Sequence, residues 1–249
     1  MPASFKDHFS ARAAEYARHR PGYPPELFSW LAGQGDRRRL AWDCATGNGQ
    51  AAVGLATHFD RVLATDLSRQ QLALAARHPR ITYCLSAAER PPLASGVVDL
   101  TTVGQAIHWF DFDGFYAEVR RVSRPGAVVA VWTYHRLEAG PEVYEALSRF
   151  RSRVESYWPP ERHWVEERYR TLPFPFPEIE PAVFLHDEDW DLERLLGYLG
   201  TWSASSRYRA ATGRDPVAEA RDGMTAAWGD PKQGRRLRWP LHLRVGRVD

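Results

Sequence analysis

The stretch Trp42-Asp43-Cys44-Ala45-Thr46-Gly47-Asn48-Gly49-Gln50 places an acidic residue at the end of an apolar segment and follows it with a glycine turn. Gly47 and Gly49 lack a Cβ atom, so the backbone can turn sharply there and can lie close to a ligand. If Gln50 to His58 forms a helix, its free N–H groups and its positive dipole end point at the same place. The stretch therefore predicts a strand, a turn and a helix that share one binding site.

A second acidic residue, Asp66, ends the next apolar segment and follows Gly49 by seventeen residues. A carboxylate at the end of such a strand can accept hydrogen bonds from both hydroxyl groups of a ribose. An acidic strand end, a glycine turn and a second acidic strand end are together typical of a site for a cofactor that contains adenosine.

Two classes of cofactor fit this turn. Gly47-Asn48-Gly49-Gln50-Ala51-Ala52 satisfies the loose G-x-G-x-x-G/A pattern of dinucleotide-binding proteins. Asp43 lies ahead of the glycines, where a carboxylate would repel a pyrophosphate and would favour a cationic ligand. S-adenosylmethionine carries a sulfonium and an ammonium group, so it suits this position, although Asp43 could also simply cap the turn.

The composition of the chain limits the class of protein. The 249 residues fit one large α/β domain or such a domain with an insertion. The formal net charge of +2 gives no strong field for nucleic acid or anionic lipid. No apolar stretch approaches the roughly twenty residues of a membrane span, and the N-terminus has no apolar signal segment. We therefore expect a cytoplasmic protein that binds neither nucleic acid nor membranes.

The two cysteines, Cys44 and Cys84, do not form a CxxC pair. A disulfide framework or a zinc site is therefore not expected, and we predict no metal. Cys44 lies inside the predicted turn, where it could face a ligand or could pack as a small apolar residue.

Strand and helix candidates alternate along the first half of the chain, which is typical of a parallel sheet covered by helices. Ser68 and Gln71 predict a capping box for a helix that continues until Pro79. Another predicted helix contains Phe115, Val119 and Val122. The five predicted strands are Leu40 to Cys44, Arg61 to Asp66, Ile81 to Leu85, Val97 to Val103 and Gly126 to Trp132.

Three segments lie outside this alternation. Residues 1–25 combine a predicted helix, Ser4 to Arg18, with a proline-rich stretch, and they could cap the carboxyl edge of the sheet or form a packing arm. Segments 138–181 and 187–230 are expected to be insertions that resemble a lid. An apolar stripe starts the first insertion on a helix begun near Pro141, and aromatic residues follow it. These aromatic residues could cover an active site or could form a satellite core.

Several motifs in a fixed order resemble those of class I S-adenosylmethionine-dependent methyltransferases of the methyltransferase type 11 group. They are Asp43 to Gln50, Asp66, Ala87-Ala88-Glu89-Arg90-Pro91-Pro92-Leu93, Val98-Asp99-Leu100, Gln105-Ala106-Ile107-His108-Trp109-Phe110 and Arg121-Val122-Ser123-Arg124-Pro125-Gly126. Further motifs are similar to the branch of the fungal-type trans-aconitate methyltransferases: Arg20-Pro21-Gly22-Tyr23-Pro24, Gln105-Ala106-x-His108-Trp109, Thr201-Trp202-Ser203 and Trp239-Pro240-Leu241-His242-Leu243-Arg244-Val245. The resemblance covers nearly the whole chain and is specific for the cofactor rather than the substrate.

The resemblance implies one Rossmann-like α/β domain over 1–249, with helices on both faces of the sheet. Its seven strands would be mostly parallel, with an antiparallel last strand at Leu237 to Val248 beside Val183 to Leu185. By the same resemblance, the floor of the cofactor site would be formed by Asp43, Ala45, Gly47 and Gly49, and Asp66 would hold the ribose. The adenine would be surrounded by Leu67, Ala87, Ala88 and Glu89. Gln105 would face the methyl group, and Tyr16 and Arg20 would cap the cofactor. Ala45 departs from the family pattern because it stands where the turn usually has its first glycine, which adopts positive φ more freely.

These expectations suggest an S-adenosylmethionine-dependent methyltransferase that acts on a small molecule through a carboxylate or another heteroatom. His108 is the candidate general base, or else a structural histidine, while Trp109, Tyr134 and Trp202 are candidate substrate contacts. A carboxylate acceptor would need no base, and alignment of the acceptor in line with the methyl group could supply most of the acceleration. An NAD(P)-dependent oxidoreductase and a non-catalytic cofactor-binding protein stay open as alternatives, and the oligomeric state is not predicted.

Overall fold

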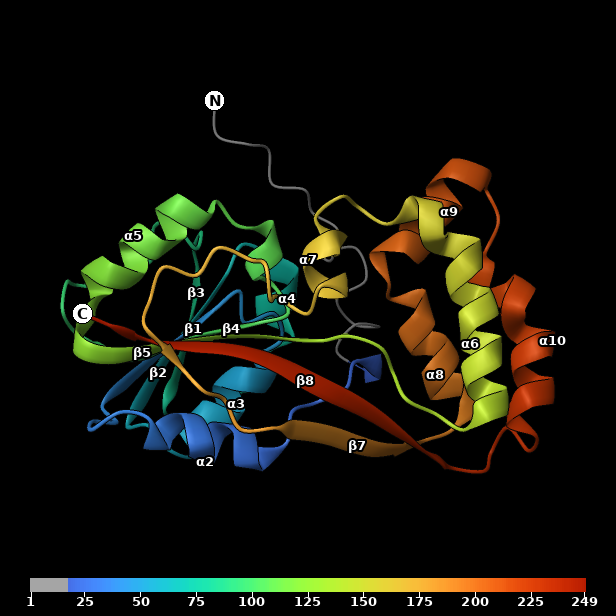
Figure 1. Cartoon of the computed structure of the whole chain (residues 1–249), viewed down its shortest axis with the longest axis horizontal. Coiled ribbons are helices and arrows are strands. Elements are labelled where there is room, and N and C mark those ends of the chain that lie inside the picture. Colours follow the sequence, from blue (N-terminus) through green and yellow to red (C-terminus); the bar gives the residue numbers. More distant parts are fainter. Residues whose placement is uncertain (1–17) are drawn as a thin grey trace.

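The computed structural model describes residues 18–249 of the chain. Tyr16 and nearly all of the predicted helix Ser4 to Arg18 lie outside these residues. A mixed sheet forms the centre of the described part, and helices cover both of its faces (Figure 1). None of the helices in residues 18–249 combines the length and the apolar character needed to cross a membrane.

The sheet has eight strands in the described part, and β1 to β5 run parallel to one another. Their order is β3-β2-β1-β4-β5-β8-β6, with β7 also paired to β8. The strands are β1 Leu40–Cys44, β2 Arg61–Asp66, β3 Ile81–Leu85, β4 Val98–Gly104, β5 Ser123–Tyr134, β6 Glu178–Ile179, β7 Phe184–Trp190 and β8 Arg235–Val248. The order reverses between β1 and β4, and open α/β sheets bind ligands at the carboxyl ends of the strands beside such a reversal.

The predicted strands agree closely with the observed ones. β1, β2 and β3 have the predicted bounds, while β4 is shifted by one residue. β5 is longer at both ends, because the predicted turn Arg124-Pro125-Gly126 is an irregularity within the strand. The register between β4 and β5 shifts there, and Gly126 has a φ of 77°. The antiparallel last strand is confirmed as β8, paired with both β5 and β7.

Alternating side chains of β5 explain how helices come to cover both faces of the sheet. Val128 and Ala130 pack in the core beneath α2 and α3, while Val129 and Val131 pack against α5 on the opposite face. The helical elements are α2 Pro25–Gly33, α3 Gln50–Ala56, α4 Arg69–Ala73, η2 Ile107–Trp109, α5 Phe112–Val122, α6 Pro141–Val154, η3 Glu155–Tyr157, α7 Arg162–Glu166, α8 Leu192–Gly200, α9 Ser203–Thr212 and α10 Pro216–Trp228.

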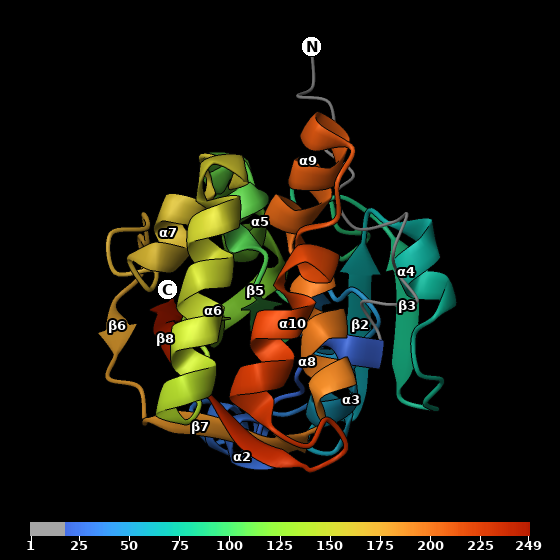
Figure 2. The same cartoon turned by 90° about the vertical axis from the view of Figure 1, so that its right-hand side faces the viewer.

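Helices α6, α8, α9 and α10 form a separate cluster beside the sheet, called the helical cluster below (Figures 1 and 2). The predicted apolar stripe of α6 is buried in it, since Val143, Leu147, Phe150 and Val154 are all enclosed. β8 connects the two parts, because Leu241–Val248 pairs with β5 while Arg235–Leu241 pairs with β7. One continuous strand therefore joins the sheet to the region that supports the helical cluster.

The predicted helix after Ser68 is shorter than expected. α4 ends at Ala73 rather than near Pro79, and Leu74 beyond it is 46% exposed. A helix at the edge of the sheet has little apolar surface to cover, so few contacts extend it. Half of the predicted capping box is present: Ser68 Oγ accepts a hydrogen bond from the backbone N–H of Gln71. The reciprocal bond is missing, because the N–H of Ser68 donates to Asp66 instead.

Candidate functional site

The carboxyl ends of β1, β2, β3 and β4 bring the predicted cofactor residues to one edge of the sheet. β1 pairs with both β2 and β4, so the turn after Cys44 lies between Asp66 and Gly104. The N–H of Thr46 donates to the carbonyl of Thr65, which fixes the start of the turn against β2. Residues from four separate stretches of sequence therefore meet beside the reversal of the strand order.

Asp43 is a buried carboxylate below this turn and is only 1% exposed. Its two oxygens accept hydrogen bonds from the hydroxyl groups of Thr46 and Thr102. Burial raises the pKa of Asp43 from 3.8 to about 6, although both hydrogen bonds act in the opposite direction. A desolvated carboxylate is stabilised by a nearby positive charge, so the ionised form of Asp43 favours a cationic ligand.

The glycine turn uses the left-handed backbone region at alternate residues. The φ angles are 54° at Ala45, 57° at Gly47 and 86° at Gly49. A Cβ atom at Gly49 would lie 2.3 Å from the hydroxyl oxygen of Tyr83, so a side chain at this position would overlap β3. Ala45 is the exception in the turn, because an alanine in this region is less stable than a glycine.

Ala45→Gly is expected to stabilise the protein by up to about 1 kcal/mol. Relief of the left-handed backbone contributes roughly 1 to 2 kcal/mol, and the greater freedom of glycine in the unfolded chain offsets about 0.4 to 1 kcal/mol of it. Urea unfolding measures the net effect. Ala210→Gly, at an exposed position in α9, is the matched control and should lower stability by about 0.5 to 1 kcal/mol. Equal losses from both substitutions would contradict strain at Ala45.

Asp66 closes the turn onto the end of β2. One carboxylate oxygen accepts the N–H of Gly47 at 2.8 Å, and the other accepts the N–H of Ser68 at 2.7 Å. An ionised carboxylate has about four acceptor positions, so these two bonds leave capacity for the hydroxyl groups of a ribose. Asp66 therefore has a structural role in the turn, and its contact with a ribose stays a prediction.

The residues predicted around the adenine lie at the same edge. Leu67 follows β2 directly and is 44% exposed, so its apolar side chain is available to a ligand. Ala87, Ala88 and Glu89 follow β3, and the carboxylate of Glu89 accepts a hydrogen bond from the N–H of Asp111 just before α5. The segment after β3 is thus tied to the segment after β4, beside the turn.

Gln105 follows β4 in a left-handed backbone conformation, and its side-chain amide contacts the end of β5. Its φ is 62°, which is uncommon for a residue with a side chain. The side-chain oxygen accepts a hydrogen bond from Thr133 at 3.0 Å, whereas the side-chain nitrogen is buried and has no partner within residues 18–249. Such strain and such a free donor are typical of functional sites.

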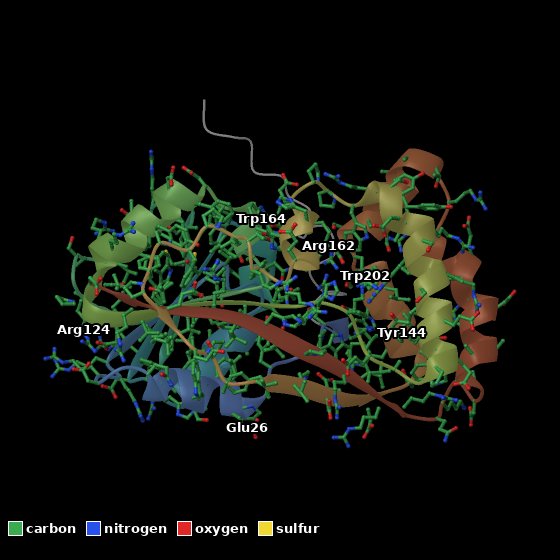
Figure 3. All side chains as sticks on the ribbon, viewed as in Figure 1. Glu26, Arg124, Tyr144, Arg162, Trp164 and Trp202 are labelled. Atoms are coloured by element: carbon green, nitrogen blue, oxygen red, sulfur yellow. The ribbon has the colours of Figure 1, made fainter. Side chains whose placement is uncertain are left out.

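A cavity lies between the carboxyl ends of β4 and β5 and the helical cluster. Its volume is about 60 Å³, enough for a few water molecules or one small group. Figure 3 shows Arg162 and Trp202, two of its lining residues, in the region between the sheet and the helices. The described residues that line it are Arg20, Gln105, His108, Trp109, Tyr134, His135, Arg151, Trp158, Pro159, Arg162, Val165, Tyr198, Trp202 and Ser203.

The cavity unites the predicted catalytic and substrate residues. His108, Trp109, Tyr134 and Trp202 all line it, as does Arg20. Arg20 donates hydrogen bonds to Tyr134 and to Thr201, so it connects the end of β5 to the end of α8. The sequence therefore identified residues from both walls of one cavity, although they are distant in the chain.

His108 is a weak base in this environment. Burial, followed by the charges of Arg162 and His163, lowers its pKa to about 3. Its Nδ1 atom lies 2.8 Å from the hydroxyl oxygen of Tyr169. The hydroxyl group of Tyr169 can donate to this nitrogen, and a neutral imidazole in that tautomer carries its proton on Nε2 and can donate a hydrogen bond there. The geometry thus supports a polar contact at His108 more strongly than proton abstraction.

Comparison with known proteins gives three related results. Residues 42–131 match the model of a methyltransferase domain family. A methyltransferase of Dictyostelium discoideum is 30% identical over 240 residues, which cover 93% of this chain and 91% of the relative. A solved structure described as a type II methyltransferase, from Anaeromyxobacter dehalogenans, is 47% identical with a TM-score of 0.85, over 92% of this chain and 98% of the other.

The chain belongs to the class I S-adenosylmethionine-dependent methyltransferases. Its fold is also that of a Haemonchus contortus phosphoethanolamine N-methyltransferase solved with S-adenosylhomocysteine, at 18% identity and a TM-score of 0.51, over 98% of this chain and 60% of the other. The comparisons do not reach the trans-aconitate branch, so that part of the resemblance stays a prediction.

The edge of the sheet in this methyltransferase fits its cofactor, S-adenosylmethionine. Two buried polar atoms there have no protein partner within residues 18–249: Oε1 of Gln71 and Nε2 of Gln105. One is an acceptor and the other a donor, and a Cβ atom added to Gly47 would lie 4.0 Å from the first. Buried polar groups are almost always satisfied in proteins, so a ligand with both donors and acceptors suits this edge.

Two arginines of the methyltransferase's cavity were not found from the sequence. Arg151 lies on α6, whose apolar stripe was predicted without regard to its other side chains, and Arg162 begins α7 in the aromatic segment. Arg207 on α9, which on sequence grounds could equally bind an anionic substrate or pair with Asp215, does not line the cavity. Asp215 pairs instead with Arg209, two residues further along the same helix.

Proposed function

We propose that this methyltransferase transfers the methyl group to a small molecule that binds in the cavity between the sheet and the helical cluster. Gln105 carries the proposal, because it belongs both to the edge that fits the cofactor and to the lining of the cavity. Its free amide donor lies where the two sites adjoin. The small size of the cavity also supports a small acceptor over a macromolecule.

The chain's own residues would hold the cofactor at the carboxyl edge. S-adenosylmethionine supplies a methyl group made electrophilic by its sulfonium charge. The carboxylate of Asp43 would favour that charge, and Asp66 would accept hydrogen bonds from the ribose hydroxyls. The Gly47 and Gly49 backbone would allow close approach, while Arg20 would close the site from the cavity side.

The cavity would hold the acceptor with its nucleophilic atom in line with the bond to the transferred methyl group. Alignment and exclusion of water would then supply most of the acceleration, without a metal. His108 would orient the acceptor by donating a hydrogen bond, since its low pKa disfavours proton uptake. For an acceptor that must lose a proton, His135 is the second histidine in the lining of the cavity, and its Nε2 atom lies 2.8 Å from the carboxylate of Glu166.

The helical cluster would act as the outer wall of the acceptor site. Segments 138–181 and 187–230 contribute most of the cavity residues that do not come from the sheet, including Arg151, Trp158 and Trp202. This supports the proposal that both segments belong to one domain over 1–249 and serve as a lid. We likewise propose that residues 1–25 cap the same edge, since Arg20 lines the cavity.

Calorimetry with S-adenosylmethionine, S-adenosylhomocysteine and NAD tests the cofactor side of this proposal. S-adenosylmethionine and S-adenosylhomocysteine should both bind at micromolar to low millimolar concentration, and NAD should not. Release of S-adenosylhomocysteine, measured with a panel of small acids, amines and phenols, then tests methyl transfer. The proposal would be overturned if neither S-adenosylmethionine nor S-adenosylhomocysteine bound.

Asp66→Ala is expected to weaken the binding of S-adenosylhomocysteine by about 1 to 3 kcal/mol, because the ribose hydroxyls lose a charged acceptor. The same variant should unfold at a slightly lower urea concentration, since the N–H groups of Gly47 and Ser68 lose their partner. Asp60→Ala, before the start of the same strand, is the control and should change neither property. Unchanged affinity in Asp66→Ala would remove Asp66 from the cofactor site.

A further inference from the structure

Arg151 reaches the cavity from α6 without an acidic partner. Its guanidinium group stacks over the ring of Trp202, 5.8 Å from the ring centre, and no ion pair or hydrogen bond holds it within residues 18–249. The two other arginines of the cavity are engaged. Arg162 pairs with Glu166 at 2.9 Å, and Arg20 donates to Tyr134 and Thr201.

The charge of Arg151 is costly in the ligand-free protein. Burial lowers its pKa, and the charges of Arg136 and Arg162 act in the same direction, whereas Tyr198 and Glu166 act in the opposite direction. An arginine does not give up its proton in proteins, so the guanidinium stays charged while partly removed from water. The described residues that line the cavity include no aspartate or glutamate, and the carboxylate of Glu166, which acts on Arg151 from outside the lining, already pairs with Arg162 and His135. A guanidinium group that stays charged while partly buried is stabilised by an anionic ligand that binds beside it.

The surrounding indoles fix the orientation of both nearby guanidinium groups. Trp202 supports Arg151, and Trp158 supports Arg162 with 4.4 Å between its ring centre and the guanidinium carbon. The two indole rings also contact each other, with 5.4 Å between their centres. Because Trp202 occupies one flat face of Arg151, its N–H edge is what this arginine can offer to a ligand, and such an edge matches the oxygens of a carboxylate or a phosphate.

We propose that Arg151 anchors an oxyanion of the methyl acceptor, so the acceptor is a small anionic molecule with a carboxylate or a phosphate group. This inference rests on the proposed function. The anchored group lies against the helical cluster, and the reacting atom faces Gln105 on the wall formed by the sheet. Arg151 is therefore a specificity-determining residue: it favours anionic acceptors and repels cationic ones that lack an anionic group.

Calorimetry of the protein saturated with S-adenosylhomocysteine tests the anchor directly. The probes are succinate, benzoate and phosphoethanolamine, with succinamide, benzamide and choline as counterparts that lack the anionic group. At least one anionic probe is expected to bind at millimolar concentration or below, and its counterpart is not. Comparison of the carboxylates with phosphoethanolamine distinguishes the two kinds of oxyanion, and the best probe is also tested as a methyl acceptor by release of S-adenosylhomocysteine.

Arg151→Gln is expected to weaken binding of the anionic probe roughly tenfold to a hundredfold. Arg151→Lys keeps the charge but not the paired N–H edges, so it should recover part of the loss. Affinity for S-adenosylhomocysteine should be unchanged in both variants, which also shows that they fold. Arg149→Gln is the matched control on the same helix: its side chain is 61% exposed and pairs with Glu145, so probe binding should not change.

Two results would overturn the inference while leaving the proposed function intact. One is that S-adenosylhomocysteine binds but no anionic probe binds better than its counterpart. The other is that Arg151→Gln binds the anionic probe as tightly as the unchanged protein. If the unchanged protein bound neither S-adenosylmethionine nor S-adenosylhomocysteine, the proposed function itself would instead be wrong.

Discussion

Asp43→Asn is expected to stabilise the ligand-free methyltransferase near pH 8 and, at the same time, to weaken its binding of S-adenosylmethionine. Burial raises the pKa of Asp43 from 3.8 to about 6, so the folded protein holds this proton more tightly than the unfolded chain does. The stability gained from the proton is complete below pH 3.8 and is lost as the pH rises through about 6. A shift of about two pKa units corresponds to a loss of about 3 kcal/mol in the free energy of unfolding when Asp43 ionises. An uncharged side chain at this position does not ionise, so the protein keeps this stability.

Asn at position 43 should therefore raise the free energy of unfolding by about 1 to 3 kcal/mol near pH 8 and by little near pH 4. Urea unfolding at the two pH values measures this difference. Asp99→Asn is the contrasting control, because this equally buried carboxylate pairs with Arg124 and accepts the N–H of Leu40. Removing its charge leaves Arg124 without a buried partner, so Asp99→Asn should destabilise the protein.

Asp43→Asn should lower the affinity for the cofactor. Binding of S-adenosylmethionine is expected to weaken about tenfold or more, since the carboxylate no longer offsets a positive charge. S-adenosylhomocysteine lacks the sulfonium charge and should lose less affinity. Calorimetry with both molecules measures the two losses. Equal losses would mean that Asp43 shapes the turn rather than favouring the sulfonium.

Gly49→Ala is expected to destabilise the fold by about 2 to 4 kcal/mol, from a left-handed backbone and an overlap with β3. The added Cβ atom would lie 2.3 Å from the hydroxyl oxygen of Tyr83, and Gly49 has a φ of 86°. The same change should abolish measurable binding of S-adenosylhomocysteine, because the turn must move to relieve the overlap. Urea unfolding and calorimetry measure the two effects.

Tyr83→Phe separates the two causes of this loss. Alone it removes a hydrogen bond from Tyr83 to the carbonyl of Ala76 and should cost only about 0.5 to 1.5 kcal/mol. Combined with Gly49→Ala, it removes the closest overlapping atom, so the double variant should be more stable than the sum of the single effects predicts. Strict additivity would show that the backbone conformation at Gly49, and not the overlap, accounts for the loss.

The sequence predicts the sheet well because the signals for its strands are local. β1 and β2 are short apolar segments that end in or next to an acid, and the glycine turn and the helix start after β1 follow in sequence. The last strand and its partner came from the resemblance, since no local pattern tells which distant strand β8 should join. The position of Asp43, Gly47, Gly49 and Asp66 around one turn follows from the parallel order of the strands.

The residues that the sequence did not reveal depend on tertiary contacts. The half capping box is one case, because the N–H of Ser68 is bound by Asp66 and this frees the side chain of Gln71. Arg151 is another, since its sequence neighbours on an amphipathic helix do not show that it enters a cavity. The weakness of His108 as a base arises from burial and from Arg162, which is fifty-four residues away in the chain.

The helical cluster has a hydrophobic core of its own, separate from the cores that support the cofactor edge. The buried residues of α6, α8, α9 and α10 pack mainly among themselves and with the start of β8, whereas the cofactor edge rests on the cores beneath and above the sheet. Substitutions in the cluster can therefore remodel one wall of the cavity without disturbing the glycine turn. Such a division lets a lineage change what it methylates while the methyl donor stays the same, and it marks the cluster as the place to redesign acceptor choice.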